Sequence, residues 1–378
     1  MQRILTTPRR DWEKQVANYG LTFHTINDET YWDESGYYHF TPNEVDMLDD
    51  VTTELHRMCL EAVEYIIHNN LFDKFLIPKE FVPLVKASWE QAEKSLYGRF
   101  DFVYDGVRPP KLLEYNADTP TALLEASVIQ WYWLQDVNQS ADQFNSIHEK
   151  LLDRFKEIGS LYGSNDNRIF YFAAQSESEE DYMTVNYLRD VAMQAGFQTE
   201  YLDMQEIGWN SQNQQFTDLE ERNIHWMFKL YPWEWMVNED FGQYLLLQKV
   251  RFFEPIWKMV LSNKAILPIL WELYPHHPNL LRAEWEPFGE TYVKKPLLSR
   301  EGANITIVSK GNTLYETQGD YGDSPCIYQE WCPLPNFYNN YPVIGSWVVG
   351  DTACGIGIRE DNSPITKDTS RFIPHLFA

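Results

Sequence analysis

The stretch Lys111–Leu123, KLLEYNADTPTAL, decides the fold that the sequence predicts. It begins with a short, mostly apolar run typical of a strand, so Glu114 and Asn116, two residues apart, leave the same face of the extended backbone. A turn-prone Ala-Asp-Thr-Pro sequence comes next, and an apolar stretch with helical spacing follows it. The segment therefore predicts a strand that ends in polar side chains, then a turn and a helix.

The preceding segment Gly98–Asp105, GRFDFVYD, alternates in the same way and places Arg99 and Asp101 on one face. An Asp-Gly pair and a Pro-Pro pair separate the two segments, which predicts a hairpin. The hairpin would bring Asp101, Glu114 and Asn116 together beside Arg99. These hard oxygen ligands suit Mg²⁺ that carries nucleotide phosphates. The alternative is an edge hairpin whose carboxylates are only solvated.

Composition favours a large folded protein, because the chain has 378 residues and 15% of them are aromatic. This length suits one large composite unit or two to three lobes. The formal net charge of −25 argues against a nucleic-acid binder or an anionic membrane surface as partner, since both need basic surfaces. Such a charge would attract a cationic substrate such as a polyamine, although acidic surfaces also serve solubility.

The four cysteines show no CxxC spacing, which argues against a zinc site or a disulfide framework. The N-terminal segment lacks an apolar stretch, and no uninterrupted apolar run approaches the ~18 residues of a membrane span. We therefore expect a protein of the cytoplasm whose substrates are small molecules. The oligomeric state is not predicted.

The middle of the chain predicts a small lobe inserted at about 165–235, within an α/β protein. Its elements are a strand, an acidic loop, a helix and two further strands, at 168–174, 175–181, 182–195, 197–202 and 224–230. Strand–helix–strand at this length is typical of a parallel sheet, which places ligands at the carboxyl ends of its strands. Apolar spacing predicts further helices at 42–70, 84–95, 121–135, 143–161 and 244–261.

A second informative segment runs over 294–304, KKPLLSREGAN. A lysine on a strand is followed by a loop with Arg300 and Gly302, and then by another strand. Backbone N–H groups around a glycine can approach phosphate closely, and Lys295 can act as a point charge on a nucleotide. The segment is not a P-loop, because GxxxxGK[ST] is absent from the sequence. The alternative is an ordinary turn.

Three further residues or segments are compatible with a nucleotide site, and each has a simpler alternative. Gln329–Cys332 ends a strand, where its backbone and Glu330 could meet an adenine edge, as any polar strand end could. Arg359 follows a buried strand and could face an anion or pair with a carboxylate. Lys264, judged from its neighbours alone, is an ordinary surface lysine.

Taken together, these residues resemble the synthetase domain of glutathionylspermidine synthases. The resemblance covers about residues 12 to 375 and is carried by the motifs RFD at 99–101, EYNADTPT at 114–121, KP at 295–296, RxGxN at 300–304, QEW at 329–331 and GIR at 357–359. It implies a single catalytic unit over residues 1–378 with a variant of the ATP-grasp fold, and an ATP-binding lid and hinge region at about 260–360. It also implies an enzyme that joins a carboxylate to an amine through an acyl phosphate made from ATP.

The resemblance assigns a role to each site residue. Asp101, Glu114 and Asn116 would hold Mg²⁺, as two ions bridging the ATP phosphates, and Arg99 and Arg359 would stabilise the transferring phosphoryl group. ATP would contact Arg99, Asp101, Lys264, Lys295, the lid residues Arg300, Glu301 and Gly302, and the adenine hinge Gln329, Glu330, Trp331 and Cys332. The acid would lie near Asp118, Thr119 and Thr121, and substrate amines near Glu179 and Glu180.

The sequence also departs from the family pattern. The bifunctional enzymes carry an N-terminal amidase domain, whereas the match here starts near residue 12, so we expect no hydrolysis of glutathionylspermidine. The family position of a substrate-contacting threonine falls in Tyr231–Trp235, which reads YPWEW. Glutathione and spermidine are therefore open as substrates. The alternative function is a catalytically silent nucleotide-binding protein that regulates or scaffolds a partner.

Overall fold

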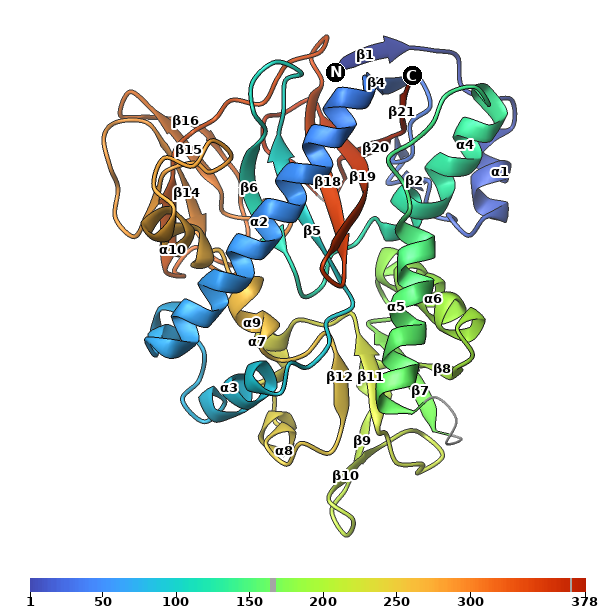
Figure 1. Ribbon diagram of the computed structural model, residues 1–378, viewed down its shortest axis with the longest axis vertical. Helices are drawn as coiled ribbons and strands as arrows, with labels where there is room; N and C mark the ends of the chain where they lie inside the picture. Colours follow the sequence, from blue (N-terminus) through green and yellow to red (C-terminus); the bar gives the residue numbers. More distant parts are fainter. Residues whose placement is uncertain (164–167, 368) are drawn as a thin grey trace.

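The computed structural model describes residues 1–163, 168–367 and 369–378. Figure 1 shows both chain termini close together at the top, next to a small sheet of order β1-β4-β21. The expected start of the inserted lobe at residue 165 lies outside the described residues. The mixed α/β class predicted from the sequence is confirmed.

A five-stranded sheet of order β20-β19-β18-β5-β6 forms the centre of the fold, with every neighbouring pair antiparallel. Its strands are β5 Tyr97–Val103, β6 Lys111–Asn116, β18 Tyr341–Val349, β19 Thr352–Asp361 and β20 Arg371–Ile373. The predicted hairpin is confirmed, because β5 and β6 pair directly. Two segments more than 200 residues apart, the hairpin and β18–β19, thus form one surface.

The long helix α2 (Pro42–His68) crosses one face of this sheet (Figure 1). It begins at the predicted cap, Thr41, whose side chain accepts from the Glu44 backbone in a capping box. Thr52 of α2 lies 2.7 Å from Ser346 of β18, between their hydroxyl oxygens. Further helices are α3 Val82–Glu90, α4 Gln130–Val137, α5 Ile147–Tyr162, α9 Lys258–Leu261 and α10 Ile266–Leu273.

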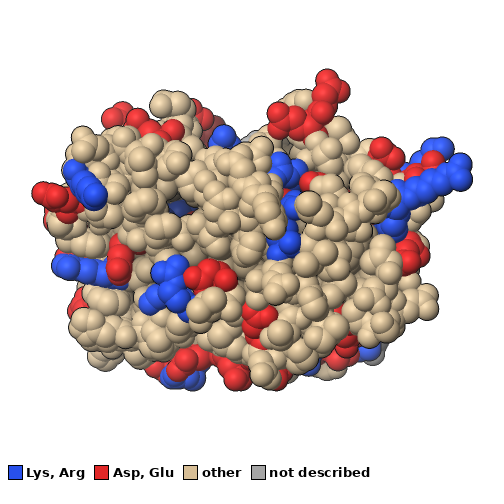
Figure 2. All heavy atoms as spheres, turned by 90° about the horizontal axis from the view of Figure 1, so that it is seen from above, with Lys and Arg blue, Asp and Glu red and all other residues tan. Residues whose placement is uncertain are grey.

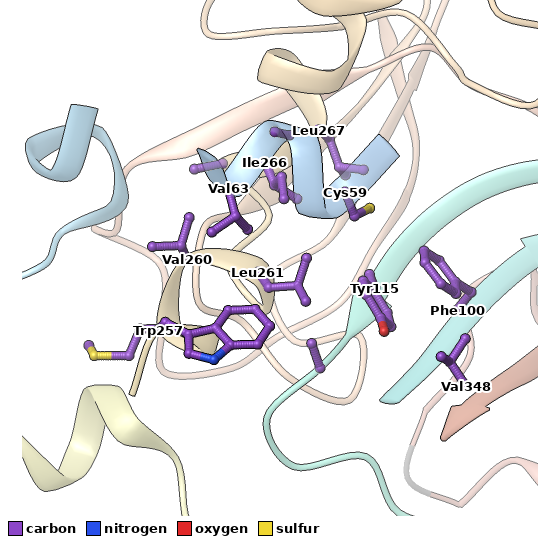
Figure 3. Close-up of a cluster of buried hydrophobic side chains, with 14 of the residues drawn as sticks. Cys59, Val63, Phe100, Tyr115, Trp257, Val260, Leu261, Ile266, Leu267 and Val348 are labelled. Atoms are coloured by element: carbon purple, nitrogen blue, oxygen red, sulfur yellow. The ribbon is translucent and has the colours of Figure 1, made fainter. Parts of the chain in front are cut away.

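Residues of the β5–β6 hairpin alternate between the core and the opposite face. Phe100 and Tyr115 stack at 3.7 Å between ring centroids, and Figure 3 shows them facing Val348 in the hydrophobic cluster that also includes α2. Their sequence neighbours, Arg99 and Asp101 on β5, therefore point away from this core. Packing of the apolar residues fixes the direction of the polar ones.

The lobe is a four-stranded parallel sheet of order β12-β11-β7-β8. Its elements are β7 Ile169–Ala174, α6 Glu179–Gln194, β8 Gln198–Asp203, β11 Trp226–Lys229 and β12 Arg251–Phe253. The predicted strand–helix–strand unit is confirmed. The helix expected over 244–261 is wrong: α8 (Gly242–Leu245), β12 and α9 replace it, because the bulky run before Pro255 pairs as an edge strand. The sheet thus takes a strand from beyond residue 235.

A second five-stranded sheet, of order β13-β17-β14-β15-β16, lies on the left of Figure 1. Its strands are β13 Ala283–Glu284, β14 Tyr292–Pro296, β15 Thr306–Ser309, β16 Asn312–Glu316 and β17 Cys326–Gln329. Lys295 and the loop that follows it connect β14 to β15, as the sequence predicted. This sheet is called the lid sheet below.

The remaining elements are peripheral or short. They are β1 Gln2–Leu5, α1 Trp12–Asn18, β2 Thr25–Ile26, β3 Glu29–Thr30, β4 Gly36–Phe40, the 3₁₀ turns η1 Leu71–Phe75 and η3 Met204–Glu206, the π-helical turn η2 Glu125–Ile129, β9 Gly208–Asn210, β10 Gln215–Thr217, α7 Trp233–Met236 and β21 His375–Phe377. Among the helices described, none combines the length and the apolar character that a bilayer crossing needs. On the face in Figure 2, basic and acidic side chains are interspersed.

Candidate active site

A cavity of about 380 Å³ lies where the central sheet, the lid sheet and the lobe meet. Its lining includes the predicted residues Arg99, Asp101, Glu114, Asn116, Thr119, Thr121, Glu180, Lys264, Lys295, Arg300, Glu301, Gly302, Gln329, Glu330, Trp331, Cys332 and Arg359. The structure thus brings together residues spread over 260 positions of the chain. Asp118 and Glu179 are the predicted site residues that do not line it.

The metal-binding residues predicted on the hairpin lie side by side. Asp101 pairs with Glu114 across β5 and β6, and Arg99 pairs with Asn116. The Asn116 amide nitrogen donates to Asp101 Oδ2 at 3.3 Å and to Glu114 Oε1 at 3.2 Å. Two carboxylates and one amide therefore converge on one point of the cavity wall, which we call the metal end.

Cations surround the carboxylates of the metal end. Arg99 Nε lies 2.7 Å from Asp101 Oδ1, Arg359 Nη2 lies 3.5 Å from Asp101 Oδ2, and Lys264 Nζ lies 3.1 Å from Glu114 Oε2. Burial alone would raise the pKa of Glu114, but Lys264, Lys295 and the Asn116 amide hold it at about 2. Glu114 is therefore ionised at neutral pH.

The donor set at the metal end fits Mg²⁺ in part. Asp101 and Glu114 offer hard carboxylate oxygens, and Asn116 offers its amide oxygen once the amide is turned, an assignment that hydrogen-bond geometry alone decides. Among the described residues, no group of three or more His, Cys, Asp or Glu is placed to hold a metal. Mg²⁺ at this site would therefore complete its shell with oxygens of water or phosphate, as is usual for nucleotide sites.

Two lysines of the cavity wall lie near Glu114 of the metal end: Lys295 on β14 and Lys264 just before α10. Burial lowers the pKa of Lys295 to about 8, although the nearby Glu114 carboxylate opposes this. Its ammonium donates to the Leu113 carbonyl at 3.0 Å, and Lys264 donates to the Ser299 carbonyl at 2.6 Å. Lys264 is thus a cavity residue rather than the surface lysine that its sequence neighbours suggested.

The loop after β14 requires glycine at position 302. Gly302 has φ of 69°, and a Cβ atom there would lie 2.4 Å from the Thr366 carbonyl oxygen. Only glycine adopts this backbone without strain and also permits the close approach. Arg300 in the same loop donates to Thr119 Oγ1 and to Glu234 Oε1, both at 2.6 Å, so the loop is tied to the lobe and to the turn after β6.

An apolar part of the cavity adjoins the end of β17. It is lined by Val293, Ile307, Trp331, Leu334 and Val343. The Gln329 side chain donates to the Leu112 carbonyl at 3.1 Å and so joins β17 to β6. Glu330 and the two residues that follow it line the cavity. A flat aromatic base fits between such apolar side chains, with strand-end backbone groups available for its polar edge.

Two predicted substrate residues lie outside the cavity. Asp118 is buried and accepts from Lys229 Nζ at 2.7 Å and from the Trp233 backbone N–H at 2.9 Å. Its carboxylate is therefore used to attach the turn after β6 to the lobe. Glu179 accepts from the Thr22 hydroxyl, away from the cavity. The helix α6 begins at Glu179, three residues earlier than expected, so successive carboxylates of its first turn point in different directions.

Four residues of the site were missed in the sequence. Asp181, Glu234 and Trp235 line the cavity or bind a lining residue, and Glu125 lies buried behind it. Asp181 was part of the acidic run at 175–181, and the other two belonged to YPWEW, which was interpreted only as a departure from the family. Glu125 was the single carboxylate within an apolar helical stretch, and a charged residue in such a stretch can indicate a buried functional group.

Comparison with known proteins decides the family. Residues 3–378 match the family described as glutathionylspermidine synthase preATP-grasp. The chain belongs to this family. It is 42% identical to a putative acid–amine ligase of Haemophilus influenzae over the full length of both chains. It is 31% identical to the bifunctional glutathionylspermidine synthetase/amidase of Escherichia coli, over 92% of this chain and 60% of that protein.

Membership of this family confirms the resemblance seen in the sequence and identifies an ATP-dependent ligase that forms C–N bonds. A solved structure, the glutathione synthetase-like effector of Globodera pallida without ligand, superposes with a TM-score of 0.60. The alignment covers 97% of this chain and 96% of that one at 10% identity, which confirms the ATP-grasp-like fold.

Proposed function

We propose that this family member joins a peptide-like carboxylate, such as glutathione, to a polyamine-like amine through an acyl phosphate made from ATP. The observation that carries the proposal is the metal end, where Asp101, Glu114 and Asn116 share one cavity with five cationic side chains. Such an arrangement matches phosphoryl transfer, in which positioning and charge stabilisation supply most of the catalysis.

Each part of the cavity has a role in this proposal. Asp101, Glu114 and Asn116 would hold Mg²⁺, as two ions, and bound Mg²⁺ would neutralise charge on the phosphates. Lys264, Lys295 and the loop at 300–302 hold the phosphates, and the apolar part beside Gln329–Cys332 takes the adenine. Arg99 and Arg359 face the metal end, where they stabilise the phosphoryl group as it moves to the acid.

The turn after β6 positions the acid. Arg99 Nη1 donates to the Thr121 carbonyl at 2.8 Å, and Arg300 donates to the Thr119 hydroxyl at 2.6 Å. Arg99 on the central sheet and Arg300 in the loop between β14 and β15 therefore hold this turn at the border of the metal end. An acid bound against Thr119 and Thr121 lies within reach of the transferring group. The amine enters from the lobe side, where Glu180 and Asp181 supply negative charge.

We also propose that the protein works in the cytoplasm. Among the described residues, the four cysteines are free thiols, and Cys59 and Cys354 are buried. Thiols of this kind suit the reducing environment of the cytoplasm.

The test is nucleotide chemistry with a panel of substrates. The protein is incubated with ATP, Mg²⁺, glutathione or short peptides, and a panel of polyamines. We expect release of ADP and phosphate together with a new amide product, and no turnover in a variant with both Asp101→Asn and Glu114→Gln. Release of AMP would contradict an acyl phosphate. Tight nucleotide binding without ADP release for any pair would favour a catalytically silent protein.

A further inference from the structure

Two carboxyl groups line the lobe side of the cavity, and their charge environment includes a third carboxyl group that is buried; we call the three the acidic cluster. Glu180 and Asp181, in the first turn of α6, line the cavity wall. Glu125, in the π-helical turn η2 that follows the turn after β6, is completely buried. The charge of Glu180 acts on both Glu125 and Asp181, so the three carboxyl groups influence one another's ionisation.

Glu125 has an incomplete set of hydrogen-bond partners. Its Oε1 accepts from the Tyr31 hydroxyl at 2.6 Å, whereas its buried Oε2 has no partner among the described residues. A buried carboxylate oxygen without a hydrogen-bond donor costs free energy unless the carboxyl group is protonated. The residue also sits in a π-helical turn, a distortion that proteins often keep at functional sites.

The surroundings of Glu125 hold its proton near neutral pH. Burial and the Glu180 carboxylate raise the pKa of Glu125 to about 7, and the Tyr31 hydroxyl and Arg359 oppose this rise. Burial, Glu180 and Glu301 likewise raise the pKa of Asp181 to about 7, against Ser178 and Arg300.

We infer that Glu125, Glu180 and Asp181 act together as the proton acceptor for the attacking amine. This inference rests on the proposed function and adds a step that the metal end cannot perform. An alkylamine is an ammonium ion in neutral water and has no lone pair for attack. Glu180 and Asp181 bind the ammonium group at the cavity wall, and a carboxylate of the cluster takes one proton. Glu125 accommodates that proton inside the protein.

The attack of the amine on the acyl phosphate moves two protons and exchanges one bond. The ammonium transfers one proton to a carboxylate, and the free amine forms the C–N bond at the carbonyl carbon of the acyl phosphate. The C–O bond to phosphate breaks, and its electron pair leaves with the phosphate oxygen. The second nitrogen proton goes to the departing phosphate, which is released as hydrogen phosphate. The carboxyl of the cluster then returns its proton to water.

Hydroxylamine separates proton removal from the rest of the reaction. It is largely a free base at pH 7, so it can attack an acyl phosphate without a proton acceptor. ADP release is measured for the wild type, Glu125→Gln and Asp181→Asn, first with hydroxylamine and a panel of acids including glutathione, and then with spermidine and other alkylamines. Glu177→Gln, an exposed carboxylate in the loop before α6, is the matched control.

We expect the two cluster variants to use hydroxylamine like the wild type and to lose on the order of 100-fold in rate with an alkylamine. The wild-type rate with an alkylamine should rise as the pH increases through about 7, and this rise should be weaker in Glu125→Gln, in which Asp181 alone titrates in this range. A Glu125→Gln variant with the wild-type rate and pH profile for the alkylamine would overturn the inference alone. Absence of ADP release with hydroxylamine and every acid would overturn the proposed function and the inference together.

A variant that fails with both nucleophiles needs a direct measurement. Infrared difference spectra between pH 5 and pH 9 report protonated carboxyl groups in the folded protein. We expect a carboxyl band in the wild type that disappears near pH 7 and is reduced in Glu125→Gln. An unchanged band in that variant would show that Glu125 holds no proton in this range, which overturns its part in the cluster.

Discussion

The metal end and the acidic cluster are both built from carboxylates, yet the cavity gives them opposite properties. Glu114 has two lysines nearby and a pKa of about 2, whereas Glu125 has another carboxylate nearby and a pKa of about 7. Glu125 is completely buried, and Glu114, whose side chain is 28% exposed, is also partly removed from solvent in the cavity wall, so burial alone does not explain the difference. The neighbours decide it: cations stabilise the ionised form, and anions stabilise the neutral form.

The largest effect should come from the metal end itself. Changing Asp101→Asn or Glu114→Gln keeps the shape of the side chain and removes a charged oxygen ligand. We expect the rate of ADP release to fall on the order of 10³-fold, because the charge on the transferring group loses its stabilisation. Steady-state assays with saturating Mg²⁺ measure this. A wild-type rate in either variant would show that the carboxylate is not a ligand.

Lys264 tests whether cations create the low pKa of Glu114. In Lys264→Met, Glu114 loses a partner at 3.1 Å, and its pKa should rise. Nucleotide affinity should weaken by about 2 to 4 kcal/mol, since the ammonium group proposed to contact the phosphates is removed. Calorimetry of ATP binding from pH 5 to pH 8 measures both effects. Lys310→Met, in the turn between β15 and β16, is the control.

Glu125→Gln tests whether the raised pKa of Glu125 makes the stability of the folded protein depend on pH. Its folded pKa of about 7 lies above the usual value of 4.5, so the folded protein binds the proton more tightly than the unfolded chain does. Stability therefore falls as the pH rises from about 4.5 to about 7, by up to about 3 kcal/mol. Glu125→Gln should remove this loss and be more stable than the wild type at pH 8.5. Urea unfolding at pH 5 and pH 8.5 measures this, and an equal pH dependence in both proteins would contradict it.

The smallest effect concerns the helix end that presents Asp181. Ser178 caps α6, and its hydroxyl accepts from the Asp181 backbone N–H at 3.2 Å. Ser178→Ala should cost about 1 kcal/mol of stability. It should also raise the pKa of Asp181 further, because that hydroxyl lowers it. The pH at which the rate with an alkylamine rises should then shift upward, which a pH–rate profile measures.

The sequence predicted the metal end well and the acidic cluster poorly, for physical reasons. Alternation along β5 and β6 determines which side chains share a face, so Asp101, Glu114 and Asn116 were found before the family was considered. Asp118 came from the family resemblance. It lies beyond the end of β6 at Asn116, where alternation no longer applies, and its carboxylate pairs with Lys229 instead of lining the cavity.

The other differences between sequence and structure arise because local sequence patterns do not contain tertiary contacts. Apolar spacing over 244–261 fits a helix as well as a strand between two short helices, and the pairing of β12 with β11 is a tertiary contact that local pattern does not contain. The direction of Lys264 and the burial of Glu125 also depend on packing between distant segments. The resemblance to a family supplied Lys264, and only the structure revealed Glu125.

The alternation of β6 has a consequence for how such enzymes diversify. Tyr115 is fixed in the core by its stack on Phe100, and the residues on either side of it form the metal end. Substitution at this strand therefore endangers both folding and the proposed phosphoryl transfer. The first turns of α6 and α7 carry little of that burden. We expect natural variation and laboratory evolution to change the choice of amine through these two turns, while the chemistry of activation is inherited unchanged.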